Sequence, residues 1–405
     1  MKYWIVRIAS IALAFAACYG LEAFSSGWDA YSQRILALVG LYVTLAVSLN
    51  LINGITGQFS IGHAAFYQVG AYFSGYLSVT YYGHGPIQGI PWLLLMMVMG
   101  AGGAAIAGLI VGLPSLRLRG DYLAIVTMGF GEIIRIIVEN QEKIGGSYGL
   151  NVAPKFLHVG IIWMLAIVCI AVCRNLLKTA HGLPFLAVRE DEIASSAMGV
   201  NVTSVKVTAF VLGSAFAGAA GALLAHYEGF ITPTTFAMDA SFIILTMVVL
   251  GGTGSITGSA ISAALLAYLP EYLRTLHNPG TTEPLAVSGA SVLAALLAVA
   301  VAVAAVRNLT NRPTLGTGGR IGGIIGVLLA AGLCKLLFQL GLSQVPYLAN
   351  LHIEAGQLRM VIFAVSLVVI MLLRPQGIFA HHEFSWSWVK KVVGIKNGPV
   401  TEVAS

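Results

Sequence analysis

Residues 182–201 have the sequence GLPFLAVREDEIASSAMGVN, in which the charged run Arg189 to Glu192 lies between two long apolar segments. Because only 9% of the chain is charged and 58% is hydrophobic, these consecutive charges require contact with water. Pro184 suits the first turn of a helix, and Gly199 suits the position just after a helix. The pattern predicts a short polar helix between two membrane spans. Two interpretations of it stay open: a surface on which a partner docks, or a solvated connecting loop.

Outward from this segment, apolar runs recur along nearly the whole chain, and 47 glycines suit closely packed membrane helices. The fold class expected is all-α, a polytopic transmembrane helical bundle with about 10–12 spans. The predicted spans are 4–20, 35–53, 59–80, 90–113, 121–138, 160–177, 203–225, 239–253, 256–270, 284–306, 321–342 and 358–373. The pair 239–253 and 256–270 is interrupted by glycines and is either two crossings or a re-entrant hairpin. Rows of small residues, Ala104-Gly108-Gly112 and Ser214-Gly218, predict closely approaching helices.

The positive charges give an orientation. If 182–201 faces the cytoplasm and the spans alternate, most of the 22 Lys and Arg residues fall on the cytoplasmic side, which predicts that both termini are cytoplasmic. The net charge of +6 is spread over short connections, so no nucleic-acid partner is expected. A tail at 381–405, with aromatic and lysine residues, is expected to lie at the cytoplasmic face.

Catalytic and metal-binding motifs are missing from the sequence. The glycine clusters contain no lysine of the kind that a P-loop requires. The four cysteines lie in apolar runs without histidine or aspartate neighbours, and we interpret them as core residues. We therefore expect neither an enzyme nor a metal or cofactor site.

Polar residues inside the predicted spans are candidates for a translocation path. Gly54 and Gly57 interrupt the first set, and breaks in spanning helices expose backbone groups that can bind polar substrates. The second set spaces Glu132, Arg135 and Glu139 along one helix face as an ion-pair ladder, for which a purely structural pair is favoured over a path lining. The path candidates are Asn50, Asn53, Gln58, His63, Gln68, Glu132 and Arg135; for His63 alone, ordinary packing is favoured over substrate contact.

Five separated motifs together resemble LivM-type permeases, the membrane subunits of branched-chain amino acid ABC importers. They are SLNLINGITGQFSIGHAAFYQVGAY (48–72), GDYLAIVTMGFGEIIRIIVEN (120–140), AVREDEIASSAMGVN (187–201), VLGGTGSITGS (249–259) and MLLRPQGIF (371–379). The likeness extends over most of 36–275 and resumes at about 355–380.

The resemblance implies an ABC importer permease fold in a bacterial cytoplasmic (inner) membrane, and import of branched-chain or other hydrophobic amino acids. The implied partners are a second, LivH-type permease, two cytoplasmic ABC ATPases, a periplasmic substrate-binding protein, a small-molecule substrate and membrane lipid. It also assigns the segment 182–201 to coupling with the ATPases, which favours docking over a simple loop. The coupling residues are then Arg189, Glu190, Asp191, Glu192, Ala194, Met198 and Gly199.

The chain departs from the family pattern at Ser195-Ser196 and at 276–356, where apolar segments are inserted; lipid-facing padding is the expected role of the insertion. The expected organisation is a transmembrane permease domain over 1–380 and the cytoplasmic tail over 381–405. Two alternatives stay open: a permease for urea or amides, and a stand-alone secondary transporter. An intramembrane enzyme would need a catalytic set that the sequence does not contain.

Overall fold

The described part of the chain is almost entirely helical. The computed structural model describes residues 15–83, 87–115, 120–275, 286–288, 291–299 and 352–354, with single residues up to 377. After a helical stretch at 15–25 come α2 (Ala30–Asn50), α3 (His63–Tyr81), α4 (Ile90–Ser115), α5 (Asp121–Glu139), α6 (Val159–Lys178), α7 (Leu183–Glu190), α8 (Glu192–Ala197), α9 (Val202–Glu228), α10 (Met238–Gly251) and α11 (Ile256–Thr275). Two short antiparallel pairs join β1 (Leu150–Asn151) to β2 (Phe230–Ile231) and β3 (Ala286–Ser288) to β4 (His352–Glu354).

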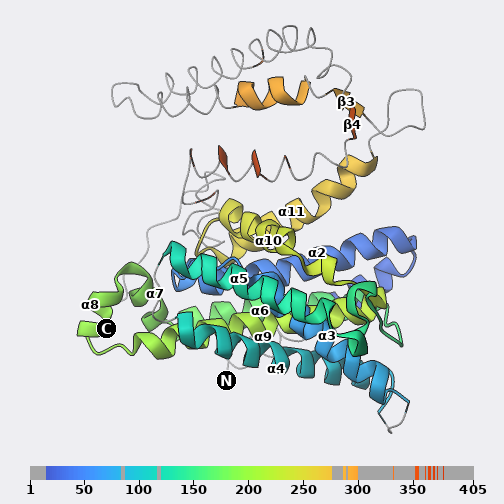
Figure 1. The fold of residues 1–405 in the computed structure, drawn as a ribbon, viewed down its shortest axis with the longest axis horizontal. Helices are drawn as coiled ribbons and strands as arrows, with labels where there is room; N and C mark the ends of the chain where they lie inside the picture. The colour runs from blue at the N-terminus through green and yellow to red at the C-terminus, as the bar shows by residue number, and fades with distance from the viewer. Residues whose placement is uncertain are drawn as a thin grey trace, which may run out of the picture.

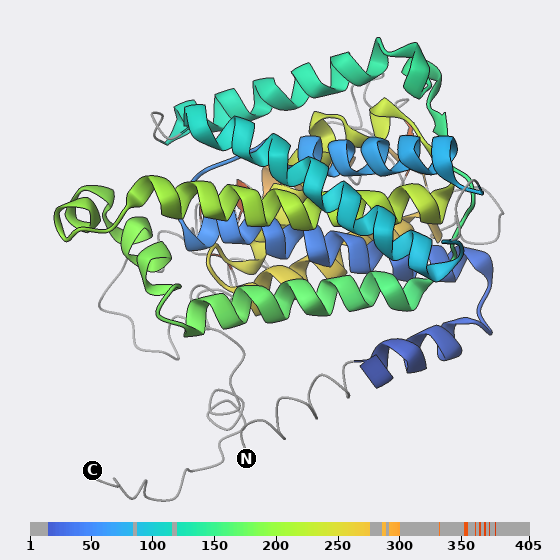
Figure 2. The ribbon, with the colours of Figure 1, turned by 90° about the horizontal axis from the view of Figure 1, so that it is seen from below.

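The long helices lie side by side in one bundle, with α2 and α9 inside it (Figures 1 and 2). Helices α7 and α8 extend from one end, which we call the α7–α8 end. At the opposite end β1 pairs with β2, and Arg34 at the start of α2 forms an ion pair with Glu228 at the end of α9, with 2.7 Å between Nε and Oε1. The predicted all-α polytopic bundle is confirmed.

Small residues bring α3, α4 and α9 into contact. The Cα of Gly218 on α9 lies so close to Ala104 and Gly100 of α4 that a methyl group there would overlap both. A methyl group at Gly70 of α3 would likewise overlap the Gly218 backbone. The small-residue rows predicted from the sequence therefore do mark a helix contact, as expected where backbones approach closely in a membrane.

Helices α10 and α11, which cover the predicted pair 239–253 and 256–270, are joined by a tight turn. This turn lies at 252–255, where Gly252 and Gly254 have φ values of 118° and 96° that favour glycine. The 14 residues of α10 span about 21 Å, less than the hydrocarbon core of a bilayer. Helix α11 then returns along α2 to the opposite end of the bundle, where Tyr31 donates a hydrogen bond to Glu271.

Most predicted spans agree with helices to within a few residues, with two differences. Residues 59–62 are not helical, because α3 begins only at His63, and α11 continues to Thr275. Within the described residues, five helical segments are long and apolar enough to cross a membrane: Ala30–Ile55, Ile90–Leu113, Val159–Lys178, Val202–Glu228 and Pro233–Gly251. Most of the predicted spans 4–20, 321–342 and 358–373, most of the insertion 276–356, and the tail 381–405 lie outside the described residues.

Candidate functional site

The chain breaks between α2 and α3, at the place where Gly54 and Gly57 occur in the sequence. Helix α2 widens into a single π-helical turn, η1 (Leu51–Ile55), and residues 56–62 are non-helical. Asn53 links the two sides of this break: its Nδ2 donates to the Ser60 carbonyl at 3.0 Å, and its Oδ1 accepts from the Ser60 amide at 3.2 Å. π-Helical turns are uncommon and are frequent at functional sites.

The first set of path candidates gathers at this break. His63 is fully buried and its Nε2 lies 2.8 Å from the Ser48 hydroxyl, so it joins α3 to α2. Gln58 is buried too, and its Nε2 donates to the Thr56 hydroxyl at 3.0 Å and to the Lys206 carbonyl at 3.5 Å. His63, Asn53 and Gln58 thus serve the local structure of the break.

The hairpin turn of α10 and α11 meets the same break. The Asn50 Oδ1 accepts a hydrogen bond from the Gly254 amide at 2.8 Å, and a methyl group at Gly54 would overlap both groups. Gly377, in the last of the five sequence motifs, packs against the backbone of Gly252 on the other side of the turn. Three of the five motifs therefore meet in space, although they lie far apart in the sequence.

Gln68 differs from the other candidates. It lies on α3 beyond the break and is fully buried, and neither amide atom has a hydrogen-bond partner among the described residues. A buried amide without a partner costs stability. Of the path candidates, Gln68 is the one most in need of a polar group supplied from elsewhere.

The charged segment forms two helices where one was expected. The chain is extended at Asp191, with φ −156° and ψ 114°, which separates α7 from α8. The Asp191 carboxylate caps α8 by accepting from the amides of Ile193 at 2.8 Å and Ala194 at 3.0 Å. An aspartate at this position stabilises a helix start, which explains why the expected single helix is wrong. Pro184 in the first turn of α7 and Gly199 after α8, with φ 86°, are as predicted.

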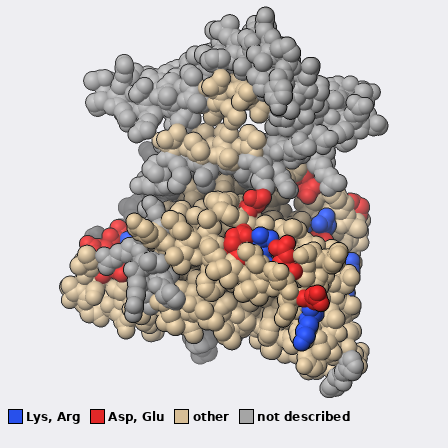
Figure 3. Space-filling view, in the orientation of Figure 1, with Lys and Arg blue, Asp and Glu red and all other residues tan. Residues whose placement is uncertain are grey.

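The four consecutive charges divide into two outward and two inward residues. Glu190 and Asp191 are exposed, and acidic side chains gather at the α7–α8 end (Figure 3). The Arg189 guanidinium donates to the Gly54 carbonyl at 3.4 Å and pairs with Glu190 at 2.7 Å. Glu192 forms an ion pair with Lys206 of α9, with 2.8 Å between Oε2 and Nζ.

The outer surface of α7 and α8 also carries apolar side chains, of which the sequence analysis named Ala194 and Met198 but missed Leu183 and Ile193. Leu183, Ile193 and Met198 are 63%, 67% and 84% exposed, and Ala194 beside them is exposed as well. The signal was present, since each of these residues lies near the polar run at 189–192. Apolar side chains exposed beside charges are typical of a protein contact surface.

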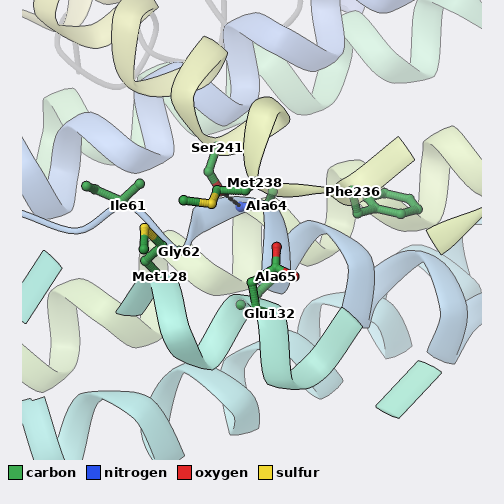
Figure 4. Close-up of a pocket in the computed structure, with 10 residues that line it drawn as sticks. Ile61, Gly62, Ala64, Ala65, Met128, Glu132, Phe236, Met238 and Ser241 are labelled. Atoms are coloured by element: carbon green, nitrogen blue, oxygen red, sulfur yellow. Dashed lines mark hydrogen bonds between the residues drawn. The ribbon is translucent and has the colours of Figure 1, made fainter. Parts of the chain in front are cut away.

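The second set of path candidates lies on α5. Arg135 pairs with Glu132 at 2.8 Å and with Glu139 at 2.9 Å, so the predicted ladder is confirmed. Glu132 also lines a small pocket (Figure 4). The pocket lies between α5, the start of α3 and the start of α10, and is lined by Ile61, Gly62, Ala64, Ala65, Met128, Gly131, Glu132, Phe236, Met238 and Ser241. The Ser241 hydroxyl accepts from the Ala64 amide at 3.0 Å across it.

Comparison with known proteins identifies the family of this chain. The family model "Branched-chain amino acid transport system / permease component" matches residues 31–302. The chain is 35% identical over 283 residues to the high-affinity branched-chain amino acid transport system permease protein LivM of Salmonella typhimurium, which covers 61% of this chain. It is 36% identical over 280 residues to LivM of Escherichia coli, 60% of this chain, and 26% identical over 254 residues to LivH of Salmonella typhimurium, 57% of this chain.

The matches differ in how much of each relative they include. The chain spans 64% of the length of each of the two LivM proteins and 81% of that of LivH. No solved structure matches the chain. The family model covers well over half of the 405 residues and includes the break, the α7–α8 segment and the hairpin turn. This multi-pass membrane protein belongs to the family of branched-chain amino acid transport system permease components.

Proposed function

We propose that the chain is the membrane-spanning permease subunit of an ATP-driven ABC importer for branched-chain or other hydrophobic amino acids. Its family membership and its resemblance to LivM support this function. In the proposed arrangement the protein lies in a bacterial cytoplasmic membrane, the α7–α8 end and both termini face the cytoplasm, and the opposite end receives substrate. The chain contributes no nucleotide chemistry of its own.

The proposed complex contains two permeases, this chain and a LivH-type chain, with two cytoplasmic ABC ATPases and a periplasmic substrate-binding protein. The observation that carries the proposal is the α7–α8 segment, which extends from the bundle and is joined by Arg189 to the break in α2. An ATPase that binds this segment can therefore act on the backbone next to Asn50, Asn53 and Gln58. The LivM and LivH relatives are named as parts of transport systems, which supports a second permease.

In this proposal the docking surface consists of the outward residues of α7 and α8. Glu190 and Asp191 supply charge, and Leu183, Ile193 and Met198 supply apolar contact area. Arg189 and Glu192 point inward and are assigned to the link between the segment and the bundle. The residues assigned to the translocation path are Asn50, Asn53, Gln58, His63, Gln68, Glu132 and Arg135. Among them Gln68 has the strongest support, because its buried amide has no hydrogen-bond partner among the described residues.

The test is to purify the tagged chain from its host and to reconstitute the complex in vesicles. A P-loop ATPase and a second permease should co-purify, and leucine uptake should require ATP and the binding protein. Uptake that follows an ion gradient without any ATPase would instead identify a stand-alone secondary transporter. Uptake of urea or amides in place of leucine would correct the substrate class alone.

The first prediction concerns the docking surface. Met198→Asp should weaken ATPase binding, because a charged group in an apolar contact costs desolvation. Glu190→Lys should do the same by reversing a surface charge. Binding is measured as the ATPase recovered with the tagged chain.

The matched control for this prediction is Tyr148→Asp. Tyr148 is an aromatic residue with 94% exposure that lies beyond α5, toward the opposite end of the bundle. The Tyr148→Asp variant should leave ATPase recovery unchanged. If Met198→Asp and Glu190→Lys also leave it unchanged, α7 and α8 are not the docking surface.

A further inference from the structure

An ion pair with one buried partner lies directly beneath the α7–α8 segment. Lys206, in the second turn of α9, is only 6% exposed, and its Nζ lies 2.8 Å from the Glu192 carboxylate. Glu192 is the first residue of α8 and is 27% exposed at its side chain. The pair therefore ties the outer helix α8 to the long helix α9, which runs the whole length of the bundle.

The same lysine is also bonded to the break in α2. The Lys206 carbonyl accepts from the Gln58 side chain at 3.5 Å, and the backbone N–H of Gln58 donates to the Ile52 carbonyl at 3.1 Å. A continuous series of polar contacts thus runs from α8 through Lys206 and Gln58 to the π-helical turn. It is independent of Arg189, which reaches the same turn at the Gly54 carbonyl.

The pair lines a space between α8, α9 and the break. A pocket of about 110 Å³ lies beside it, lined by Thr56, Gly57, Gln58, Gly120, Leu123, Val188, Glu192 and Lys206. The space is large enough for water, since one water molecule needs about 10–15 Å³ of volume open to its centre. Glu192 of α8 and residues 56–58 of the break thus line the same space.

Such a pair contributes little to stability compared with apolar residues of similar volume, because removing the Lys206 charge from water costs about as much as its attraction to Glu192 returns. What the ion pair provides instead is a fixed partner for each of the two side chains and a fixed direction of contact between α8 and α9. We propose that Glu192 and Lys206 are positioning residues for coupling: they transmit movement of the α7–α8 segment to α9 and to the break in α2. This inference rests on the proposed importer function and adds an internal role for Glu192, distinct from docking.

The test compares four variants of the assembled complex in vesicles: Glu192→Gln, Lys206→Met, the charge exchange Glu192→Lys with Lys206→Glu, and the apolar pair Glu192→Leu with Lys206→Met. Amino acid uptake per ATP hydrolysed should fall about tenfold in both single variants, within the usual range of coupling between linked sites. ATPase recovery should stay unchanged. The charge exchange should restore most of the uptake, and the apolar pair should be thermally stable but remain uncoupled.

The matched control is Glu228→Gln, which breaks the Arg34–Glu228 ion pair between the same helix α9 and α2 at the opposite end. It should not change uptake per ATP. Normal coupling in the single variants, no rescue by the exchange, or loss of ATPase recovery in Glu192→Gln would each overturn the inference. Because the apolar pair is expected to fold, it decides the question even if the single variants are unstable. Absence of ATP-driven uptake in the unaltered protein would overturn the importer function itself.

Discussion

At the scale of single residues, the polar side chains within the bundle have separate tasks. Asn53 satisfies the Ser60 backbone at the break, Gln58 joins the break to the Lys206 carbonyl of α9, and Asn50 holds the hairpin turn through Gly254. Since water is absent from the membrane interior, these freed backbone groups need such partners. Gln68 holds no described group in place, and its amide atoms are buried without a partner among the described residues.

Gln68 therefore gives the second prediction, in which stability and activity change in opposite directions. Gln68→Met keeps the size of the side chain and removes the unpaired amide, so it should stabilise the protein by about 1–3 kcal/mol. If Gln68 contacts the passing substrate, uptake should fall in the same variant, as is usual where function is maintained at a cost in stability. Thermal unfolding in detergent and uptake in vesicles measure the two effects.

Gln58→Met is the comparison variant. The Nε2 of Gln58 donates to both the Thr56 hydroxyl and the Lys206 carbonyl, so removal of this side-chain amide should destabilise the protein by about 1–3 kcal/mol. If Gln68→Met proves more stable and transports normally, Gln68 is not part of the path.

At the scale of helices, the contact of α3, α4 and α9 depends on backbone approach. Gly70, Gly100 and Gly218 meet where any side chain would separate the helices. Within a membrane the apolar effect does not drive helices together, and close packing takes over that role. The contact fixes α9, whose first turns carry Lys206 and whose last residue pairs with Arg34.

The third prediction tests this contact. Gly218→Val should destabilise the bundle by about 3 kcal/mol, because overpacking forces the helices apart. Gly102→Ala on α4 is the control, since no atom lies within 4 Å of an added methyl group there. It should be neutral or stabilising by about 0.5–1 kcal/mol, as for alanine in place of glycine within a helix. Equal stability of the two variants, measured by thermal unfolding in detergent, would mean that the contact is loose.

At the scale of the whole molecule, each end of the bundle carries its own set of polar contacts. One end carries α7, α8 and their inward links to the break. The other carries the β1–β2 pair and the Arg34–Glu228 ion pair. Helix α9 joins the two ends, which makes it the element through which movement at one end can reach the other.

The fourth prediction concerns orientation in the membrane. In a variant whose native cysteines are replaced, Met198→Cys should react with an impermeant maleimide only from the cytoplasmic side. Tyr148→Cys should react only from the periplasmic side. Cys18, Cys169 and Cys173 are buried, so their replacement leaves the labelled surfaces intact. Labelling of both positions from one side would contradict the proposed orientation.

The sequence by itself determined the helices and their composition. Long apolar runs bury their own backbone hydrogen bonds, so span positions, the glycine interruptions and the Glu132–Arg135–Glu139 ladder follow from local pattern. The same local rules misplaced the start of α3 and joined α7 to α8, because the bonds that decide these ends come from Ser60 and from the Asp191 cap. The sequence could identify Arg189 and Glu192 as charged, but not as inward-facing.

Only the tertiary structure decided which polar residues meet. Asn50 meets Gly254, Arg189 meets Gly54, and Glu192 meets Lys206, each across a gap in the sequence that no periodicity spans. The physical reason is that a hydrogen bond or ion pair depends on the distance between atoms, and that distance is set by how whole helices pack. Connection between the α7–α8 segment and the broken helix is therefore a property of the bundle and of no single segment.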